Sequence, residues 1–134
     1  MTPAMSDALL LLDTTVLIDV LRNRNRRRAW LEQLVVSGKT LAISVITIAE
    51  IHSGLRPGEE TSTKAQLANL EWIPVSAAIA ERAGVMKCAS ARQGETHNIL
   101  DLMIAATAME RGCPLATDNQ RHFQFPGVTL IPIP

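Results

Sequence analysis

The first strongly patterned stretch of the chain is a run of four leucines, Leu9 to Leu12. It has no polar alternation, so it predicts a strand buried on both faces of a parallel sheet. Apolar residues then recur at helical spacing at Val16, Leu17, Val20 and Leu21. Asp13 lies between the strand and the helix, at the end of a strand where open α/β sheets place their ligands. An aspartate before two threonines is also a good helix N-cap, so both interpretations stay open.

Similar patterns continue to the end of the chain. Further strands are expected at 41–44, 71–75, 114–116 and 128–131. Helices are expected at 29–36, 45–55, 64–70 and 77–92, and from the capping residue Asn98 to Arg111. This alternation predicts an α/β fold, a single domain over residues 1–134 with a mostly parallel central sheet flanked by helices. Residues 1–7 are polar and are expected to form a flexible lead-in.

Composition narrows the class of protein. Apolar residues make up 47% of the 134 residues and tyrosine is absent, which argues against a disordered segment or an aromatic stacking module. The formal net charge is zero, so any nucleic-acid binding must be local. The early apolar run is too short for a signal peptide, and we expect a cytoplasmic protein with no membrane partner. Cys88 and Cys113 are expected to be buried thiols in a reducing compartment.

Carboxylates recur at positions where burial is expected. Glu50 borders an apolar face of the helix at 45–55, and Asp118 lies where the strand at 114–116 ends. Asp101 heads a row of small apolar residues at helical spacing, formed by Ile104, Ala105 and Ala108. A carboxylate in such a place is costly unless it is paired or bound to a metal.

Packed together, Asp13, Glu50, Asp101 and Asp118 would repel one another, and a divalent cation would remove that penalty. Oxygen ligands without a cluster of Cys or His favour Mg²⁺, with Mn²⁺ as a substitute. We therefore predict that these four residues are the catalytic residues and the metal ligands. Such a site suits hydrolysis of a phosphate ester by metal-activated water. The three histidines are expected to be surface or capping residues. Only His122 is close enough in sequence to Asp118 to be a candidate residue of the site.

Three sequence blocks occur in a fixed order: LLLLDTTVLID, ITIAEIHSGL and ILDLMIAATAMERGCPLATDNQRHF. In this order the chain resembles the PIN-domain ribonucleases, most closely the toxin subunits of VapBC toxin–antitoxin modules. The resemblance implies a Mg²⁺-dependent endoribonuclease that leaves a 5′-phosphate and a 3′-hydroxyl. It places Asp13, Glu50 and Asp101 on the first three acids of the family, with Asp13 and Asp101 as direct metal ligands. It also implies the toxin of a type II module, with RNA as substrate, a cognate antitoxin as partner, and a homodimer or a hetero-oligomer with the antitoxin.

The fourth acidic block departs from the family pattern. Many relatives read Thr-x-Asp here, whereas this chain has Asn119 at the usual acid position and Asp118 one residue early. Thr15 stands where many relatives carry Asn or Ser. Thr15, Thr117 and Asn119 are candidate contacts to phosphate or water. The altered block keeps a second hypothesis open, a catalytically weak PIN-like binding or regulatory module, although the first three acids argue against it.

Five arginines gather in the seven residues at 22–28. Such a run is typical of a solvated helix start. The alternative is a surface that faces the RNA backbone, with Arg26, Arg27 and Arg28 as the contacts.

Overall fold

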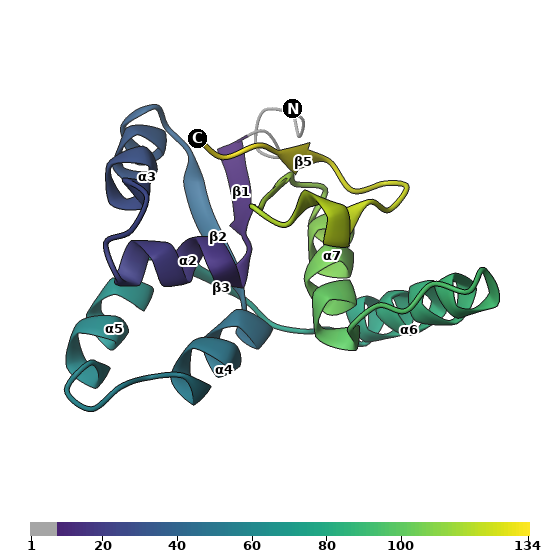
Figure 1. Ribbon diagram of the computed structural model, residues 1–134. Coiled ribbons are helices and arrows are strands. Elements are labelled where there is room, and N and C mark those ends of the chain that lie inside the picture. The colour runs from purple at the N-terminus through teal and green to yellow at the C-terminus, as the bar shows by residue number, and fades with distance from the viewer. Residues whose placement is uncertain (1–7) are drawn as a thin grey trace.

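In the described part of the chain, five strands form one sheet in the order β3-β2-β1-β4-β5 (Figure 1). The computed structural model describes residues 8–134, so the lead-in expected at residues 1–7 lies outside the described residues. The strands are β1 Leu9–Leu12, β2 Thr40–Ser44, β3 Glu71–Ile73, β4 Leu115–Ala116 and β5 Leu130–Ile131. Every neighbouring pair is parallel, and β1 lies in the middle between β2 and β4. The predicted α/β fold with a parallel sheet is confirmed.

Residues 9–134 contain six α-helices and one 3-10 helix. They are α2 Thr14–Leu21, α3 Arg27–Val36, α4 Val45–Ser53, α5 Glu60–Leu67, α6 Ala77–Arg92, α7 Ile99–Arg111 and η1 Gln120–Phe123. The side chains of Asp13, Ser44, Ser76 and Asn98 accept backbone hydrogen bonds as N-caps. The helix expected at 64–70 is observed at Glu60–Leu67, with Thr63 and Leu67 buried one turn apart on the face that packs on the fold. The short helix η1 was not predicted.

The leucines of β1 divide between the two faces of the sheet. Leu9 and Leu11 belong to the cluster that contains residues of α7, while Leu10 and Leu12 belong to the cluster that contains residues of α2, α3, α4 and α5. Figure 1 shows these two groups of helices on opposite sides of the central strands. The predicted burial of β1 on both faces is confirmed. Asp13 follows this central strand and therefore lies in the middle of the sheet's edge.

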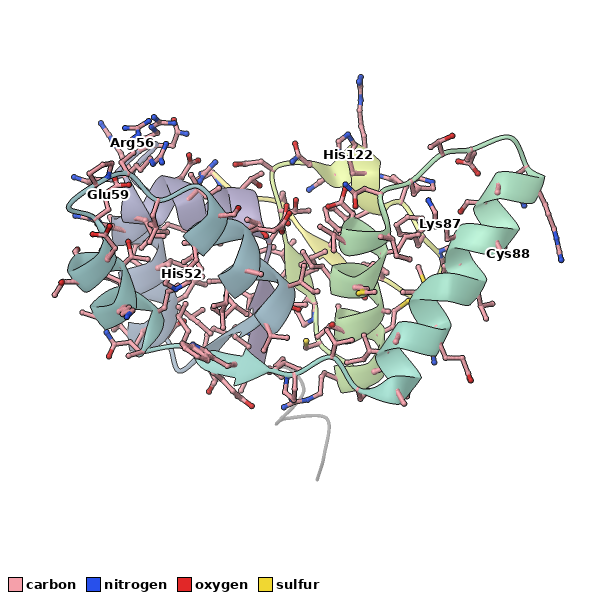
Figure 2. The ribbon with its side chains drawn as sticks, turned by 90° about the horizontal axis from the view of Figure 1, so that it is seen from below. His52, Arg56, Glu59, Lys87, Cys88 and His122 are labelled. Atoms are coloured by element: carbon pink, nitrogen blue, oxygen red, sulfur yellow. The ribbon has the colours of Figure 1, made fainter. Side chains whose placement is uncertain are left out.

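Helix α6 packs against α7 and extends away from the sheet (Figure 1). Only Ile79 and Ala83 are buried along it. Cys88 is consequently exposed, as Figure 2 shows, whereas Cys113 is buried. The expectation that both thiols are buried was wrong for Cys88, because α6 contacts the fold along one narrow face. Among the helices of residues 8–134, none has the length and apolarity needed to cross a membrane.

Candidate functional site

Asp13 follows β1 directly and begins α2. Its residue is 3% exposed, and the Oδ1 atom accepts a hydrogen bond of 2.8 Å from the backbone N–H of Thr14. The N-cap predicted from the sequence is therefore present. It uses only part of the carboxylate, which has about four lone-pair positions. An N-cap and a ligand role are compatible in the same side chain.

Two hydroxyl groups fix the second oxygen of Asp13. Thr15 Oγ1 donates to Asp13 Oδ2 at 3.1 Å, and Thr117 Oγ1, at the end of the neighbouring strand β4, donates at 2.7 Å. With the Thr14 bond, three of the four lone-pair positions are used. The carboxylate is held in one orientation with one position left for a cation or water. The predicted contacts of Thr15 and Thr117 with phosphate stay predictions.

Glu50 is hydrogen-bonded to Thr14 at the start of α2, a contact that was not predicted from the sequence. Thr14 Oγ1 donates to Glu50 Oε1 at 2.7 Å and lies 2.9 Å from Thr47 Oγ1. Since the single hydroxyl proton of Thr14 goes to Glu50, Thr47 is the donor in the second bond. Thr47 and Glu50 are one turn apart on α4, so their spacing on one helix face was the available signal.

Asp101 lies in the first turn of α7 and is half-buried. Burial is the main cause that raises its pKa above the ordinary 3.8, and the negative charges of Asp13 and Glu50 raise it further. His122 and His97 act in the opposite direction. The carboxylates that follow β1 and lie on α4 are thus close enough to repel that of Asp101 on α7. The predicted convergence of the first three acids has this electrostatic support.

His122 lies close to Asp101. Its Nδ1 atom is 4.0 Å from Asp101 Oδ2, and its side chain is exposed at the surface of η1 (Figure 2). Phe123 is buried and holds η1 against the sheet, which leaves His122 beside α7. Sequence reasoning related His122 to Asp118, because the contact between η1 and α7 is not visible from local spacing.

The three acids do not form a closed metal cage. In the range 8–134, no three Asp, Glu, His or Cys side chains already have the spacing of a metal site. Mg²⁺ does not require one, because it is commonly held by one or two carboxylates and keeps several water molecules. The donor set of hard oxygen atoms, with one open position on Asp13, fits that mode of binding.

Asp118 forms an ion pair with Arg27. Arg27 Nη2 donates to Asp118 Oδ1 at 2.7 Å, and Arg27 Nε lies 3.6 Å from Asp19 Oδ2. Arg27 Nη1 also donates to the backbone carbonyl of Pro134. A metal-ligand role for Asp118 stays a prediction, now in competition with this ion pair.

The predicted RNA surface at 26–28 needs correction. Arg27 is 5% exposed, so its proposed contact with RNA was wrong: the side chain is buried against acidic partners. Arg28 donates to the carbonyls of Val20 at 2.8 Å and Leu21 at 3.1 Å, which caps the end of α2. Arg26 is exposed in a left-handed conformation and remains a candidate. The backbone N–H of Asn119 donates to Thr117 Oγ1 at 2.9 Å, which fixes the turn that follows β4.

A profile of the PIN domain matches residues 10–127, and the chain belongs to the PIN-domain family. It is 37% identical over 115 residues to Ribonuclease VapC10 of Mycobacterium tuberculosis, covering 86% of each chain. Ribonuclease VapC19 of the same organism is 32% identical over 120 residues, covering 87% of this chain and 94% of its own. The resemblance inferred from the sequence blocks is confirmed.

Solved structures give the same result for the fold. VapBC2 from Rickettsia felis, bound to a DNA fragment from its promoter, matches with a TM-score of 0.82 and 26% identity over 94% of this chain and 99% of that chain. A toxin–antitoxin complex from Klebsiella pneumoniae matches with a TM-score of 0.72 and 32% identity over 90% and 95%.

Proposed function

We propose that this protein is a Mg²⁺-dependent endoribonuclease and the toxin of a toxin–antitoxin module. The observation that carries the proposal is the meeting of the acids at the end of β1: Thr14 hydrogen-bonds both Asp13 and Glu50, which comes from α4. The charges of these two acids, after burial, raise the pKa of Asp101 on α7. A protein keeps carboxylates in mutual repulsion at a cost, which is recovered when a cation binds. The PIN-domain relatives named as ribonucleases support RNA as the substrate.

The residues divide the work by their contacts. Asp13 is oriented by three hydrogen bonds, and its charge helps to raise the pKa of the half-buried Asp101, so these two are the proposed direct ligands. Glu50 keeps Oε1 on Thr14, which leaves Oε2 to accept a hydrogen bond from an attacking water molecule. When bound, Mg²⁺ supplies Lewis-acid stabilisation of the phosphate and a more acidic water.

An antitoxin partner is part of the proposal. The structural relatives from Rickettsia felis and Klebsiella pneumoniae were solved as toxin–antitoxin complexes, which supports a cognate antitoxin for this chain. We also propose that the chain forms a homodimer through its helices. Light scattering at micromolar concentration tests this second part, and a strict monomer would contradict it.

A catalytically weak binding module is the second candidate. It is favoured by the fourth block, where Asn119 stands at the acid position and Asp118 pairs with Arg27. The two candidates differ in whether the purified chain cleaves RNA in the presence of a divalent cation.

The experiment is an RNA cleavage assay in Mg²⁺, in Mn²⁺ and in EDTA. We expect cleavage by the wild type with either metal, none in EDTA, and a loss of more than about 100-fold in Asp101→Asn, beyond the usual effect of losing an outer-shell partner. Glu110→Gln is the matched control, because Glu110 lies on the same helix and pairs with Arg82 at the surface. Folded wild-type protein that leaves RNA intact in both metals would favour the binding module.

A further inference from the structure

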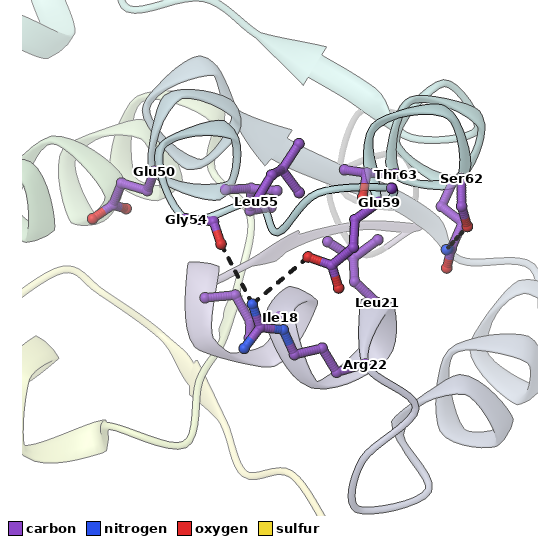
Figure 3. A pocket seen from close by; sticks show the side chains of 12 residues that line it. Ile18, Leu21, Arg22, Glu50, Gly54, Leu55, Glu59, Ser62 and Thr63 are labelled. Carbon is purple, nitrogen blue, oxygen red and sulfur yellow. Dashed lines mark hydrogen bonds and ion pairs between the residues drawn. The ribbon is translucent and has the colours of Figure 1, made fainter.

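A cavity of about 470 Å³ lies beside the acidic site, between α2, α4 and α5 (Figure 3). Its volume falls in the range of about 300–1,000 Å³ that is typical of small-ligand sites. Glu50 is the residue shared by the cavity and the acidic site. A substrate whose phosphate reaches the three carboxylates would have its neighbouring groups at the mouth of this cavity.

The cavity has an apolar wall and a polar edge. The wall is formed by Ile18, Leu21, Ile51 and Leu55. The polar edge is formed by Arg22, Glu59, Ser62 and Gln66. This division suits a flat ring with hydrogen-bonding groups along its rim. In an RNA substrate, the nucleotide base is the part that combines a flat ring with hydrogen-bonding groups at its edge.

Arg22 and Glu59 are only loosely engaged with each other. Arg22 Nη2 lies 3.5 Å from the carbonyl oxygen of Gly54 and 4.0 Å from Glu59 Oε1, both at the long limit of a polar contact (Figure 3). Most of the five donors of the guanidinium therefore remain for a ligand. The backbone N–H of Arg56 donates to Glu59 Oε1 at 2.7 Å, which orients the Glu59 carboxylate.

We propose that this cavity binds the base of a nucleotide flanking the scissile phosphate, and that the preferred base is guanine. A guanidinium donor next to a carboxylate acceptor complements a guanine edge, with O6 and N7 as acceptors and N1–H and the amino group as adjacent donors. No other base offers two adjacent N–H groups to one carboxylate. The inference rests on the proposed RNA substrate, and a peptide segment is the competing occupant.

Binding is tested without catalysis. The four nucleoside monophosphates are titrated into the full chain, and the side-chain NMR signals of Arg22 and Gln66 are followed in EDTA. We expect guanosine monophosphate to shift these signals at about tenfold lower concentration than the other three. Glu59→Gln is expected to remove the preference, and Glu60→Gln, an adjacent acid outside the cavity, to keep it. No shift of the cavity signals by any nucleotide would overturn the proposal.

Cleavage supplies the second readout. Cut sites of wild type and variants are mapped on a randomised RNA pool in Mn²⁺. We expect guanine enrichment at one position next to the cut, reduced about tenfold in Arg22→Met but unchanged in Arg56→Met, since Arg56 is exposed outside the cavity. Equal profiles for both variants would overturn the base site, and so would a cavity variant that loses only antitoxin binding. Guanosine monophosphate binding without any RNA cleavage would instead contradict the proposed nuclease.

Discussion

Removing Asp118 is expected to destabilise the fold more than removing Arg27, although both changes break the same ion pair. The side chain of Arg27 is 6% exposed, whereas that of Asp118 is 36% exposed. In Asp118→Ala the buried guanidinium keeps only Asp19 at 3.6 Å and the carbonyl of Pro134, and its Nε already lacks a hydrogen bond. Leaving a buried charge so poorly compensated costs about 3–5 kcal/mol.

Arg27→Met leaves a different residue without its partner. Water already reaches the Asp118 carboxylate, so the main loss is the charge-assisted hydrogen bond to Asp118, about 1.5–3 kcal/mol. The bond to the carbonyl of Pro134 and the 3.6 Å contact with Asp19 are lost with it. The methionine keeps much of the apolar stem in place. The double variant contains no buried cation, so it should resemble Arg27→Met rather than the sum of the two single changes.

Urea unfolding followed by circular dichroism measures the three free energies of unfolding. The reasoning is refuted if Asp118→Ala is less destabilising than Arg27→Met, or if the two changes are additive. The same proteins test the competing role of Asp118. A variant that loses metal-dependent cleavage while it keeps its free energy of unfolding would identify Asp118 as a ligand instead of a structural partner.

Three further predictions concern the acidic site and its rim. Asp101→Asn should raise the free energy of unfolding at neutral pH in EDTA, because the raised pKa penalises the charged form in the folded state. That gain in the free energy of unfolding should shrink as pH falls through the raised pKa towards 3.8. Urea unfolding at several pH values measures it, and a difference between variant and wild type that does not change with pH would contradict the prediction. Thr117→Val should cost about 1–3 kcal/mol and lower RNA cleavage by releasing Asp13, with both effects reversed in Thr117→Ser. Arg26→Ala should weaken RNA binding and reduce its salt slope by about one, and an unchanged slope would make Arg26 a solvated residue only.

Local patterns were sufficient for most of the fold. The run Leu9 to Leu12 predicted a buried parallel strand, and the structure places those residues in the two cores. Helix α6 was predicted at its observed bounds, since Ser76 is a side-chain N-cap and the helix ends before a glycine of positive φ. Asp13 could be located because a strand end and a helix cap meet there.

Contacts between distant segments were the part that the sequence could not supply. Arg27 was grouped with its exposed neighbours because a run of arginines is usually solvated, while its actual partner Asp118 is 91 residues further along the chain. The Thr14 bond to Glu50 also joins two helices, and two adjacent threonines gave no reason to choose Thr14 over Thr15. Such pairings depend on how the helices pack against the sheet.

The most direct test of the account is a crystal of the protein soaked in Mn²⁺ and measured for anomalous scattering. We expect one strong peak between the carboxylates of Asp13 and Asp101, with ligand distances of about 2.1 Å and water completing the coordination. The same soak of Asp101→Asn should lose the peak. A Mn²⁺ ion bound elsewhere, or none beside Asp13 in crystals saturated with the metal, would contradict the claim that these acids share a cation.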